Sequence, residues 1–203
     1  MKSLPATLSL LLLACNGKLP AADTPKLSVA FQEKMKDDFE KDNPKWTFAA
    51  GTWERRAGAL AQTAETQPWA VAILEDKTFA DVDVTVRFRP ISGKEDASGG
   101  VIFRAKDAKN YYLVRANGLE DNFRLYTMKG GNRGQIASTK VSAPKLGDWH
   151  SIRVVAKGTK IQAYLDGKLQ IDHDDATYTE GYVGLWTKAD SVTEFDDLEA
   201  SGN

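Results

Sequence analysis

Residues Gly99–Arg124 read GGVIFRAKDAKNYYLVRANGLEDNFR, and this stretch decides the fold class. Its apolar side chains recur at every second position, which is the side-chain period of a β-strand. Short polar segments such as KDAKN at residues 106–110 separate the runs and contain residues that favour turns. The stretch therefore predicts three consecutive antiparallel strands joined by hairpins.

The same pattern continues on both sides of this stretch. From Lys45 to the C-terminus the segments are short and rich in β-branched or aromatic residues, with turn signals at KGGNRG (129–134), AKGTK (156–160) and LDGK (165–168). No long helical pattern interrupts them. Many short strands predict an all-β fold, with two antiparallel sheets packed as a jelly-roll sandwich. Before this region, Phe31, Met35 and Phe39 recur at helical spacing and predict a short amphipathic helix.

Aromatic side chains are expected to supply most of the core. We expect five of them to fill the space between the two sheets: Trp46, Trp53, Trp69, Phe79 and Phe88. The chain has a single cysteine and therefore no internal disulfide, so burial of apolar surface must stabilise the domain.

Length and charge limit the function classes. The chain has 203 residues, enough for one sizeable core, and we expect one domain and a monomer. Its formal net charge is −1, so no excess of positive charge favours nucleic acid as a partner.

The N-terminus has the form of an export signal. The run LSLLLLACNG (8–17) is too short to span a bilayer and follows a short segment with Lys2. Residues Leu12–Cys15 resemble a bacterial lipobox, which predicts a signal peptide over 1–15 with Cys15 lipidated, a flexible tether over 16–34 and the folded domain over 35–203. Ordinary secretion with cleavage near LPAAD (19–23) and an unprocessed buried thiol are the alternatives. The prediction is a periplasmic or cell-surface protein that contacts the membrane only through its lipid anchor.

Several longer motifs resemble a known family. They are DDFEKDNPKWTFAAGTWE (37–54), DVDVTVRFRPISGKEDASGGVIFRAKDAKNYYLVRAN (81–117), EDNFRLY (120–126), GDWHSIRVVAKGTKIQAYLDGK (147–168) and GYVGLWTKADSVTEFDDL (181–198). Together they resemble the 3-keto-disaccharide hydrolase domain family, which has a concanavalin A-like, laminin-G-like jelly roll. NYYLVRAN and GLWTKADS are the more specific parts. The resemblance implies an exported bacterial domain that binds or acts on carbohydrate, since some members are named for cleavage of 3-keto sugars.

Alternation along the opening stretch assigns its side chains to two faces. If Val101, Phe103 and Ala105 point to the core, Arg104 points the other way. The next strand then buries its even-numbered residues and exposes its odd-numbered ones, Tyr111, Leu113, Arg115 and Asn117. The third strand exposes Asn122, Arg124 and Tyr126. The arginines Arg104, Arg115 and Arg124 are thus expected on one polar face.

This face has the side chains that a sugar site needs. Planar amide and guanidinium groups hydrogen-bond hydroxyls, and aromatic rings stack on the apolar side of a sugar ring. Arginine can also hold a carboxylate, a sulfate or a carbonyl oxygen. The alternative is that the arginines pair across strands with acids such as Glu120 and Asp121.

The stretch GLWTKADS adds a second group of candidates. Trp186 and Lys188 fall on one face, and Asp190 falls at the following turn. Trp186 is either a stacking surface for a sugar or an indole of the core. The full predicted ligand set is Arg104, Arg115, Asn117, Asn122, Arg124, Tyr126, Trp186, Lys188 and Asp190.

The acidic residues near the C-terminus have a spacing that also occurs in a catalytic strand. Glu194, Asp196 and Glu199 are similar in spacing to the catalytic strand of laminarinase-type glycoside hydrolases. A retaining hydrolase needs two carboxyl groups about 5 Å apart on one face. Alternation puts Glu199 on the opposite face unless a bulge shifts the register. We therefore expect solvated acids here, with a structural calcium ion at Asp196 or Asp197 as the alternative.

The two histidines indicate no metal centre. His150 follows Trp149 at a strand start, and His173 lies in the acidic run IDHDD, which is typical of a solvated turn. A metal site at His173 with Asp172, Asp174 and Asp175 would have only one imidazole. No cofactor is predicted.

Three functions are consistent with these residues. The first is a carbohydrate-binding module. The second is an enzyme that cleaves 3-keto-glycosides by hydrolysis or elimination, with Glu120, Asp121 or Asp190 as the base and Arg104, Arg115 or Lys188 stabilising charge. The third is a non-catalytic protein-interaction module of the cell surface.

Overall fold

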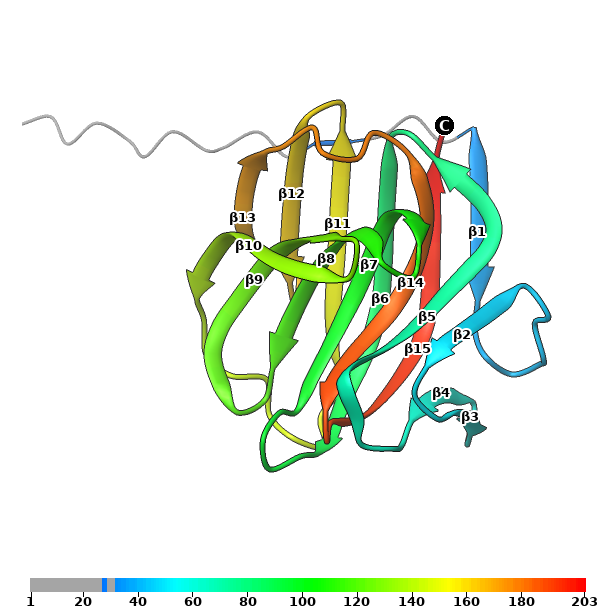
Figure 1. The fold of residues 1–203 in the computed structure, drawn as a ribbon, viewed down its shortest axis with the longest axis vertical. Helices are drawn as coiled ribbons and strands as arrows, with labels where there is room; N and C mark the ends of the chain where they lie inside the picture. Colours follow the sequence, from blue (N-terminus) through cyan, green and yellow to red (C-terminus); the bar gives the residue numbers. More distant parts are fainter. Residues whose placement is uncertain (1–26, 29–31) are drawn as a thin grey trace, which may run out of the picture.

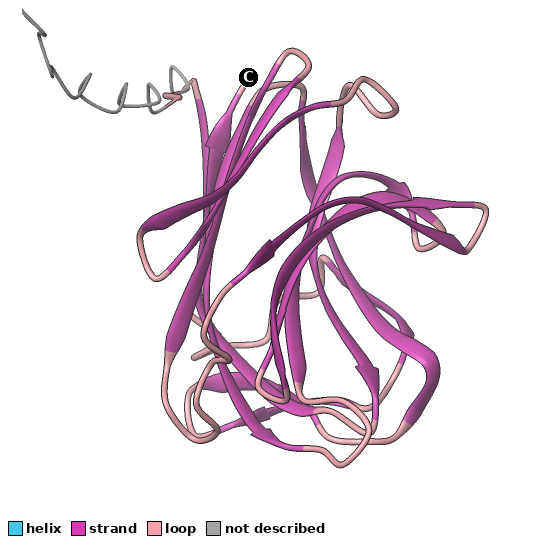
Figure 2. Ribbon diagram, turned by 90° about the vertical axis from the view of Figure 1, so that its left-hand side faces the viewer, coloured by secondary structure: helices cyan, strands magenta, loops and turns pink. Residues whose placement is uncertain are grey.

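The computed structural model describes residues 27–28 and 32–203, and these residues form β-strands and loops without a helix (Figures 1 and 2). The predicted all-β sandwich is confirmed, because the strands lie in two antiparallel sheets. No helix in this part of the chain could cross a membrane. Cys15 and the predicted signal peptide lie outside the described residues.

One sheet has eight strands and the other has seven. The eight-stranded sheet has the order β13 (Lys168–Asp174), β12 (Lys160–Leu165), β11 (His150–Lys157), β6 (Val82–Ser92), β15 (Val192–Gly202), β4 (Ala59–Gln62) and β3 (Trp53–Arg56), and β1 (Glu33–Asp37) also pairs with β15. The seven-stranded sheet has the order β10 (Asn132–Lys140), β9 (Glu120–Lys129), β8 (Asn110–Asn117), β7 (Ser98–Asp107), β14 (Gly181–Ala189), β5 (Thr66–Phe79) and β2 (Trp46–Ala50). Consecutive strands β6 and β7 lie in different sheets, so the chain crosses the sandwich between them.

The main core lies between the two sheets. Val84, Val86 and Phe88 of β6 alternate with polar residues, and they meet Val101 and Phe103 of β7 from the other sheet. Burial of such side chains contributes about 25 cal/mol per Å² of apolar surface. The prediction for this core is confirmed for Trp46, Phe79 and Phe88, and Trp53 packs partly buried against the same cluster.

The predicted helix at Phe31, Met35 and Phe39 is wrong. Met35 lies in β1, opposite Ala200 of β15, and the side chains of β1 from Lys34 to Asp37 alternate between exposed and buried. Asp37 then ends the strand, because its carboxylate accepts hydrogen bonds from Phe39 N and from Trp46 Nε1. Pairing with β15 buries Met35 in a strand register that local helical spacing does not reveal. Phe31 lies outside the described residues.

A second apolar cluster covers the outer face of the seven-stranded sheet. Its buried members are Val71, Ile73, Ile102, Ala105, Tyr111, Leu113, Tyr126, Met128 and Trp186. Trp69 packs on this cluster, so the prediction that it lies between the sheets is wrong. Tyr111 and Leu113 lie on the predicted face but are fully buried, whereas we expected them to be exposed.

Curvature of the seven-stranded sheet explains this burial. Arg133 comes from the edge strand β10, yet its guanidinium lies 4.7 Å from the Tyr126 ring centroid, 5.6 Å from Trp69 and 5.8 Å from Trp186. Trp69 lies on β5 and Trp186 on β14, several strands away in the sheet. The β9–β10 hairpin therefore curls over the outer face and makes it concave (Figure 1).

Candidate functional site

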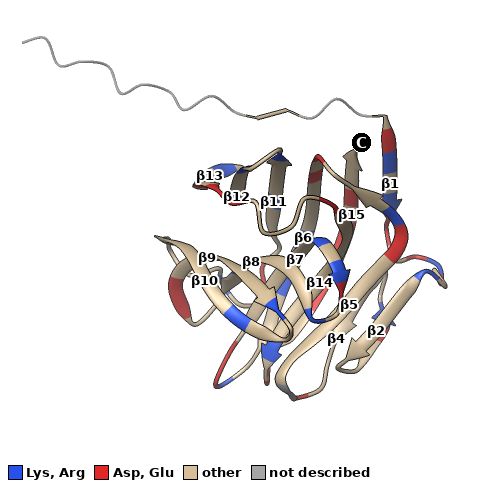
Figure 3. Ribbon diagram, turned by 45° about the horizontal axis from the view of Figure 1, so that its top comes forward, with Lys and Arg blue, Asp and Glu red and all other residues tan. Residues whose placement is uncertain are grey.

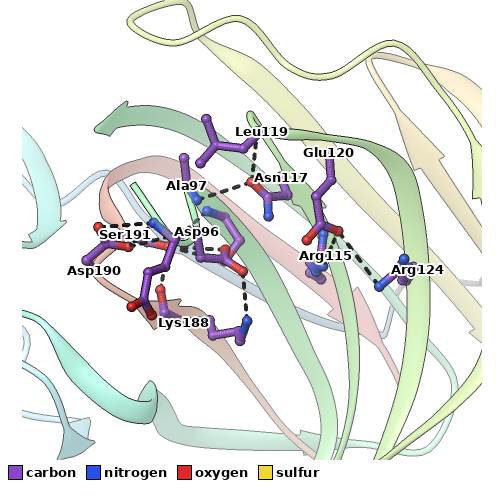
Figure 4. Close-up of polar contacts among 12 residues, drawn as sticks. Asp96, Ala97, Arg115, Asn117, Leu119, Glu120, Arg124, Lys188, Asp190 and Ser191 are labelled. Atoms are coloured by element: carbon purple, nitrogen blue, oxygen red, sulfur yellow. Dashed lines mark hydrogen bonds and ion pairs between the residues drawn. The ribbon is translucent and has the colours of Figure 1, made fainter. Parts of the chain in front are cut away.

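Six polar residues gather at one end of this concave face, which we call the polar end (Figure 4). They are Asp96, Arg115, Asn117, Glu120, Arg124 and Lys188. Asn117 lies between the Asp96–Lys188 pair and the cluster of Glu120 with the two arginines. Its side chain accepts a hydrogen bond from Ala97 N, next to Asp96, and its backbone lies opposite Glu120 in the sheet. Both signs of charge are present along these strands (Figure 3).

Arg115 and Arg124 lie directly opposite each other on β8 and β9. Like charges in that position repel, and Glu120 compensates them. Its Oε2 lies 2.9 Å from Arg115 Nη2, 2.9 Å from Asn122 Nδ2 and 3.8 Å from Arg124 Nη1. Burial alone would raise the pKa of Glu120, but the hydrogen bonds from Arg115 and Asn122 and the charges of both arginines lower it to about 2. Glu120 is therefore a fixed anion at neutral pH.

Asn117 is fully buried and only half of its amide is used. Its Oδ1 accepts hydrogen bonds from Ala97 N at 3.1 Å and Leu119 N at 2.9 Å, which hold the turn after β8 against the loop before β7. Its Nδ2 is buried and has no hydrogen-bond partner in the protein. The amide orientation is thus fixed by two backbone donors, and its own donor group is left unpaired beneath the concave face.

Asp96 and Lys188 form a partly buried ion pair beside Asn117. The Asp96 side chain is fully buried, and its Oδ2 lies 3.3 Å from Lys188 Nζ. Its Oδ1 accepts from Ser191 Oγ at 3.3 Å. Lys188 is about one-third exposed, so its ammonium group can reach both Asp96 and the surface of the concave face.

Asp190 organises the loop that presents Asp96. Its carboxylate accepts hydrogen bonds from the backbone of Lys94, Glu95 and Asp96 at 2.5 to 3.3 Å. These donors, with Lys94 N as the largest contribution, lower the pKa of Asp190. These hydrogen bonds hold the loop against the turn after β14, so Asp190 positions Asp96 next to Lys188.

The aromatic end of the concave face lies beneath Arg133. Trp186 and Lys188 share this face as predicted, but Trp186 is fully buried and is not a free stacking surface. Tyr126 lies between Arg133 and Arg124, and its hydroxyl lies 3.4 Å from Arg124 Nη1. Burial raises the pKa of Tyr111, so its phenol stays protonated.

Buried polar atoms without a protein partner concentrate on the concave face. Among the described residues, seven such side-chain atoms occur, and six of them belong to this face: Tyr111 Oη, Arg115 Nε, Asn117 Nδ2, Arg124 Nε, Arg133 Nη1 and Trp186 Nε1. Tyr111 Oη and Trp186 Nε1 lie near each other but form no hydrogen bond of normal geometry. An unsatisfied buried group costs about 1 to 3 kcal/mol. Five of the six atoms are donors only, so they match a ligand rich in acceptor oxygens.

Arg104 does not join the other arginines, which corrects the sequence-based prediction. It has a φ of 48°, and the register of β7 with β8 shifts after Phe103. This bulge turns Arg104 toward the end of the sandwich, where its Nε donates to Ala80 O at 2.8 Å and its Nη1 to Tyr178 O at 3.2 Å. Burial lowers the pKa of Arg104. The same shift puts Ala105 in the outer cluster instead of the main core.

A second bulge changes the arrangement of the C-terminal acids. Asp197 has a φ of 48°, and the register shifts between Asp196 and Glu199. Glu199 therefore faces outward with Glu194 and Asp196, whereas strict alternation predicted the opposite face. All three lie on the outer face of the eight-stranded sheet and pair with cations, namely Arg89, Arg87 and Lys36.

No metal centre emerges from the predicted acids. Over the described ranges, no group of three or more histidine, cysteine or acidic side chains is arranged to hold a metal ion. His150 Nδ1 instead lies 2.8 Å from Asp166 Oδ2 and packs on Phe88. Asp174 pairs with Lys160, and Asp175 accepts from the Tyr112 hydroxyl and from Thr177 N.

Sequence reasoning missed two residues of the concave face. Asp96 lies in the loop KEDASGG, which has no period that could assign it to a face. Arg133 lies among glycines that indicate only a turn, and nothing local shows that the hairpin folds over the sheet. Both depend on contacts between strands far apart in the sequence.

Comparisons with known proteins agree with this architecture. A family model described as the 3-keto-alpha-glucoside-1,2-lyase-like domain matches residues 31–200. The chain is 27% identical to levanase of Bacillus subtilis over 142 residues, which is 69% of this chain and 20% of levanase. It is 30% identical to an extracellular exo-alpha-L-arabinofuranosidase of Streptomyces chartreusis over 136 residues, which is 66% of this chain and 16% of that enzyme.

A solved structure shows the same fold. The carbohydrate-binding module CBM66 from Bacillus subtilis superposes with a TM-score of 0.72 at 23% identity, covering 78% of this chain and 96% of the module. The chain thus spans nearly all of that module but at most a fifth of the curated relatives.

Proposed function

The chain belongs to the 3-keto-alpha-glucoside-1,2-lyase-like domain family, and from this premise we propose that it is a carbohydrate-binding module that holds a glycan at the polar end of its concave face. The names of its relatives support a carbohydrate ligand. Since two of them are a levanase and an arabinofuranosidase, furanose-containing glycans are the first ligands to examine.

The observation that carries this proposal is the set of unpartnered donors on the concave face. Asn117 Nδ2, Arg115 Nε and Arg124 Nε lie on two neighbouring strands just beneath the surface, and a shift of the covering side chains would let them donate to the hydroxyl and ring oxygens of one sugar. Two of these donors are already held in place, Asn117 by two backbone amides and Arg115 by Glu120. A ligand that completes such fixed groups gains hydrogen bonds without paying for their ordering.

The rim of the polar end offers an apolar contact as well. Leu119 lies in the turn between β8 and β9 and is 44% exposed. Its backbone amide donates to Asn117 Oδ1, so the turn is anchored directly above the amide. Leu119 can therefore cover the apolar side of a sugar whose hydroxyls meet Asn117 and Arg115.

The decisive substitution is Asn117→Asp. It keeps the oxygen that accepts from Ala97 N and Leu119 N but replaces the free donor with an acceptor. We expect calorimetric titration with levan, arabinan and xylan oligosaccharides to show at least tenfold weaker binding than wild type, about 1.4 kcal/mol.

Arg87→Ala is the matched control, because Arg87 lies on the outer face of the other sheet. Its affinity should equal that of wild type. Thermal unfolding of all three proteins separates lost contacts from lost folding. Unchanged affinity of the Asn117→Asp protein for a glycan that wild type binds would exclude the polar end as the site.

An enzyme is the second candidate, favoured by the family description and by the partly buried ion pair of Asp96 and Lys188. Elimination from a 3-keto-glycoside begins with removal of the proton on C2, the carbon between the carbonyl and the anomeric carbon. The resulting enolate then expels the glycosidic oxygen, which breaks the C–O bond. Asp96 would accept that proton, Lys188 would stabilise the enolate oxygen, and a solvent water would protonate the departing sugar oxygen.

Activity is tested by incubating a 3-keto-disaccharide with the protein and measuring released monosaccharide. Release that Lys188→Met abolishes would establish the enzyme. Glycan binding without release establishes the module, and neither response would favour the protein-interaction module of the cell surface.

We also propose export and attachment of a lipid at Cys15. The apolar run before Cys15 and the extracellular relative support this proposal. In a bacterial host, the wild-type chain should be found in the membrane fraction, with the mass of a diacylglyceryl group on Cys15. Cys15→Ala should release it from that fraction, whereas a soluble wild-type protein cleaved after LPAAD would identify ordinary secretion.

A further inference from the structure

An aromatic slot opens at the edge of the sandwich, away from the concave face. It lies between the loop 38–45 and the strands β2, β3 and β4, and we call it the edge slot. Its volume is about 260 Å³, and its lining includes Phe39, Trp46, Phe48 and Leu60, together with Asp42 and Arg55.

The slot is an opening of the core between the sheets. β2 is the edge strand of its sheet, and Phe48 lies opposite Ala72 of β5, on the side that faces the other sheet. Yet Phe48 is 46% exposed, whereas Trp46, two residues earlier on the same face, is 9% exposed. Among the residues that the structure describes, Phe48 is the only aromatic side chain with such exposure. The core is therefore closed over Trp46 and open over Phe48.

Phe48 is held in a stack of rings. Its centroid lies 6.3 Å from that of Trp46 at an interplanar angle of 7°, and 6.0 Å from that of Trp53 at 22°. Trp46 is fixed in turn, because its Nε1 donates to Asp37 Oδ2 at 2.8 Å. The exposed ring thus has a fixed orientation before any ligand arrives, which lowers the entropic cost of stacking on it.

The rim carries polar groups of both signs. Arg55 Nη2 lies 2.7 Å from Asp42 Oδ1, and the side chains are 35% and 92% exposed. An ion pair this exposed contributes little stability and can exchange partners. Lys41 adds a donor, and the buried Asp37 carboxylate balances it. Since the charges cancel, the rim suits neutral hydroxyl groups better than an anion.

We propose that the edge slot is a second sugar subsite, which stacks one ring of a neutral glycan on Phe48 while Arg55 and Asp42 hydrogen-bond its hydroxyls. An aromatic face beside planar polar groups is the combination that sugar rings require. The inference shares the ligand class of the proposed function but uses none of the residues at the polar end.

The test compares two substitutions of the same residue. Phe48→Leu keeps an apolar side chain but removes the flat ring, and Phe48→Trp enlarges the ring. Calorimetric titration with levan, arabinan and xylan oligosaccharides should give two sites for wild type and one site for Phe48→Leu. Phe48→Trp should keep both sites, and the fluorescence of wild-type protein should change as ligand fills the slot beside Trp46.

The outcomes separate the two proposals. If titration shows a single site that is lost in Asn117→Asp and kept in Phe48→Leu, the edge-slot proposal is overturned and the proposed function is kept. One site with the opposite response would support the slot and overturn the polar end. Failure of wild type to bind any of the three glycans would overturn both. A wild-type dimer that Phe48→Leu dissociates, measured by sedimentation, would identify the slot as a protein interface and overturn the sugar subsite.

Discussion

At the scale of single residues, one carboxylate, that of Glu120, compensates the positive charges on the concave face. Glu120 lies within hydrogen-bond distance of Arg115 and within ion-pair distance of Arg124, and these two arginines are direct cross-strand neighbours. Without that carboxylate two positive charges would face each other across β8 and β9. Glu120 therefore contributes both to the stability of this part of the sheet and to the orientation of the donors.

The low pKa of Glu120 predicts how stability depends on pH. Because the folded pKa is about 2 and the ordinary value is 4.5, its contribution is complete above pH 4.5 and disappears as the pH falls toward 2. The carboxylate is 35% exposed, so solvent screening reduces the expected contribution to about 1 to 2 kcal/mol. Urea unfolding at pH 7 should show Glu120→Gln less stable than wild type by this amount. The two proteins should converge near pH 2, and an equal difference at both pH values would contradict the role of the carboxylate.

Residue-scale chemistry was only partly predictable from the sequence. Alternation correctly placed Arg115, Asn117 and Arg124 on one face, because the one register shift between β8 and β9, before Asn117, skips two residues of β9 and so preserves the face. It failed at Arg104, which itself forms a bulge with a φ of 48°. It also failed at Glu199, which follows a bulge at Asp197, where φ is again 48°. Nothing local marks such a residue, because the surrounding sheet imposes the conformation.

At the scale of elements, the strands were predictable and their curvature was not. The period of two identified the strands that form both sheets, whereas helical spacing at Met35 and Phe39 was misleading. The curl of the β9–β10 hairpin is a long-range feature, and it decides that Tyr111 and Trp186 are buried beneath Arg133. The alternating pattern therefore placed Tyr111 and Trp186 on the correct face of the sheet, but it could not show that the hairpin buries them there.

The hairpin can be tested through the ring contacts of Arg133. Its guanidinium lies above Tyr126 and near Trp69 and Trp186, and such contacts contribute about 0.5 to 2 kcal/mol. Arg133→Ala should destabilise the protein by that amount in urea unfolding and increase quenching of tryptophan fluorescence by acrylamide. Arg56→Ala, which removes an exposed arginine paired with Glu54, is the control and should change neither. Unchanged quenching in Arg133→Ala would mean that the hairpin does not cover the indoles.

At the scale of the whole molecule, the two proposed sites lie on different surfaces of one rigid sandwich. The polar end belongs to β8, β9 and β14, and the edge slot belongs to β2, β3 and the loop before β2. The sheet order places β2 at the edge opposite to β10, with β5 between β2 and β14. A long glycan chain can therefore engage both sites only if it bends around the edge of the seven-stranded sheet, whereas a branched or insoluble glycan can offer a separate chain to each site.

This geometry predicts a difference between soluble and immobilised ligands. When two sites engage one surface, the second binding event becomes intramolecular and the apparent affinity rises well above that of either site. Wild-type protein should bind an immobilised branched levan at least tenfold more tightly than a short levan oligosaccharide, by surface plasmon resonance and calorimetry respectively. Asn117→Asp and Phe48→Leu should each reduce the immobilised affinity to that of a single site, and the double variant should not bind. Equal affinity of wild type for both ligand forms would show that the two surfaces do not act together, even if each site binds sugar when measured alone.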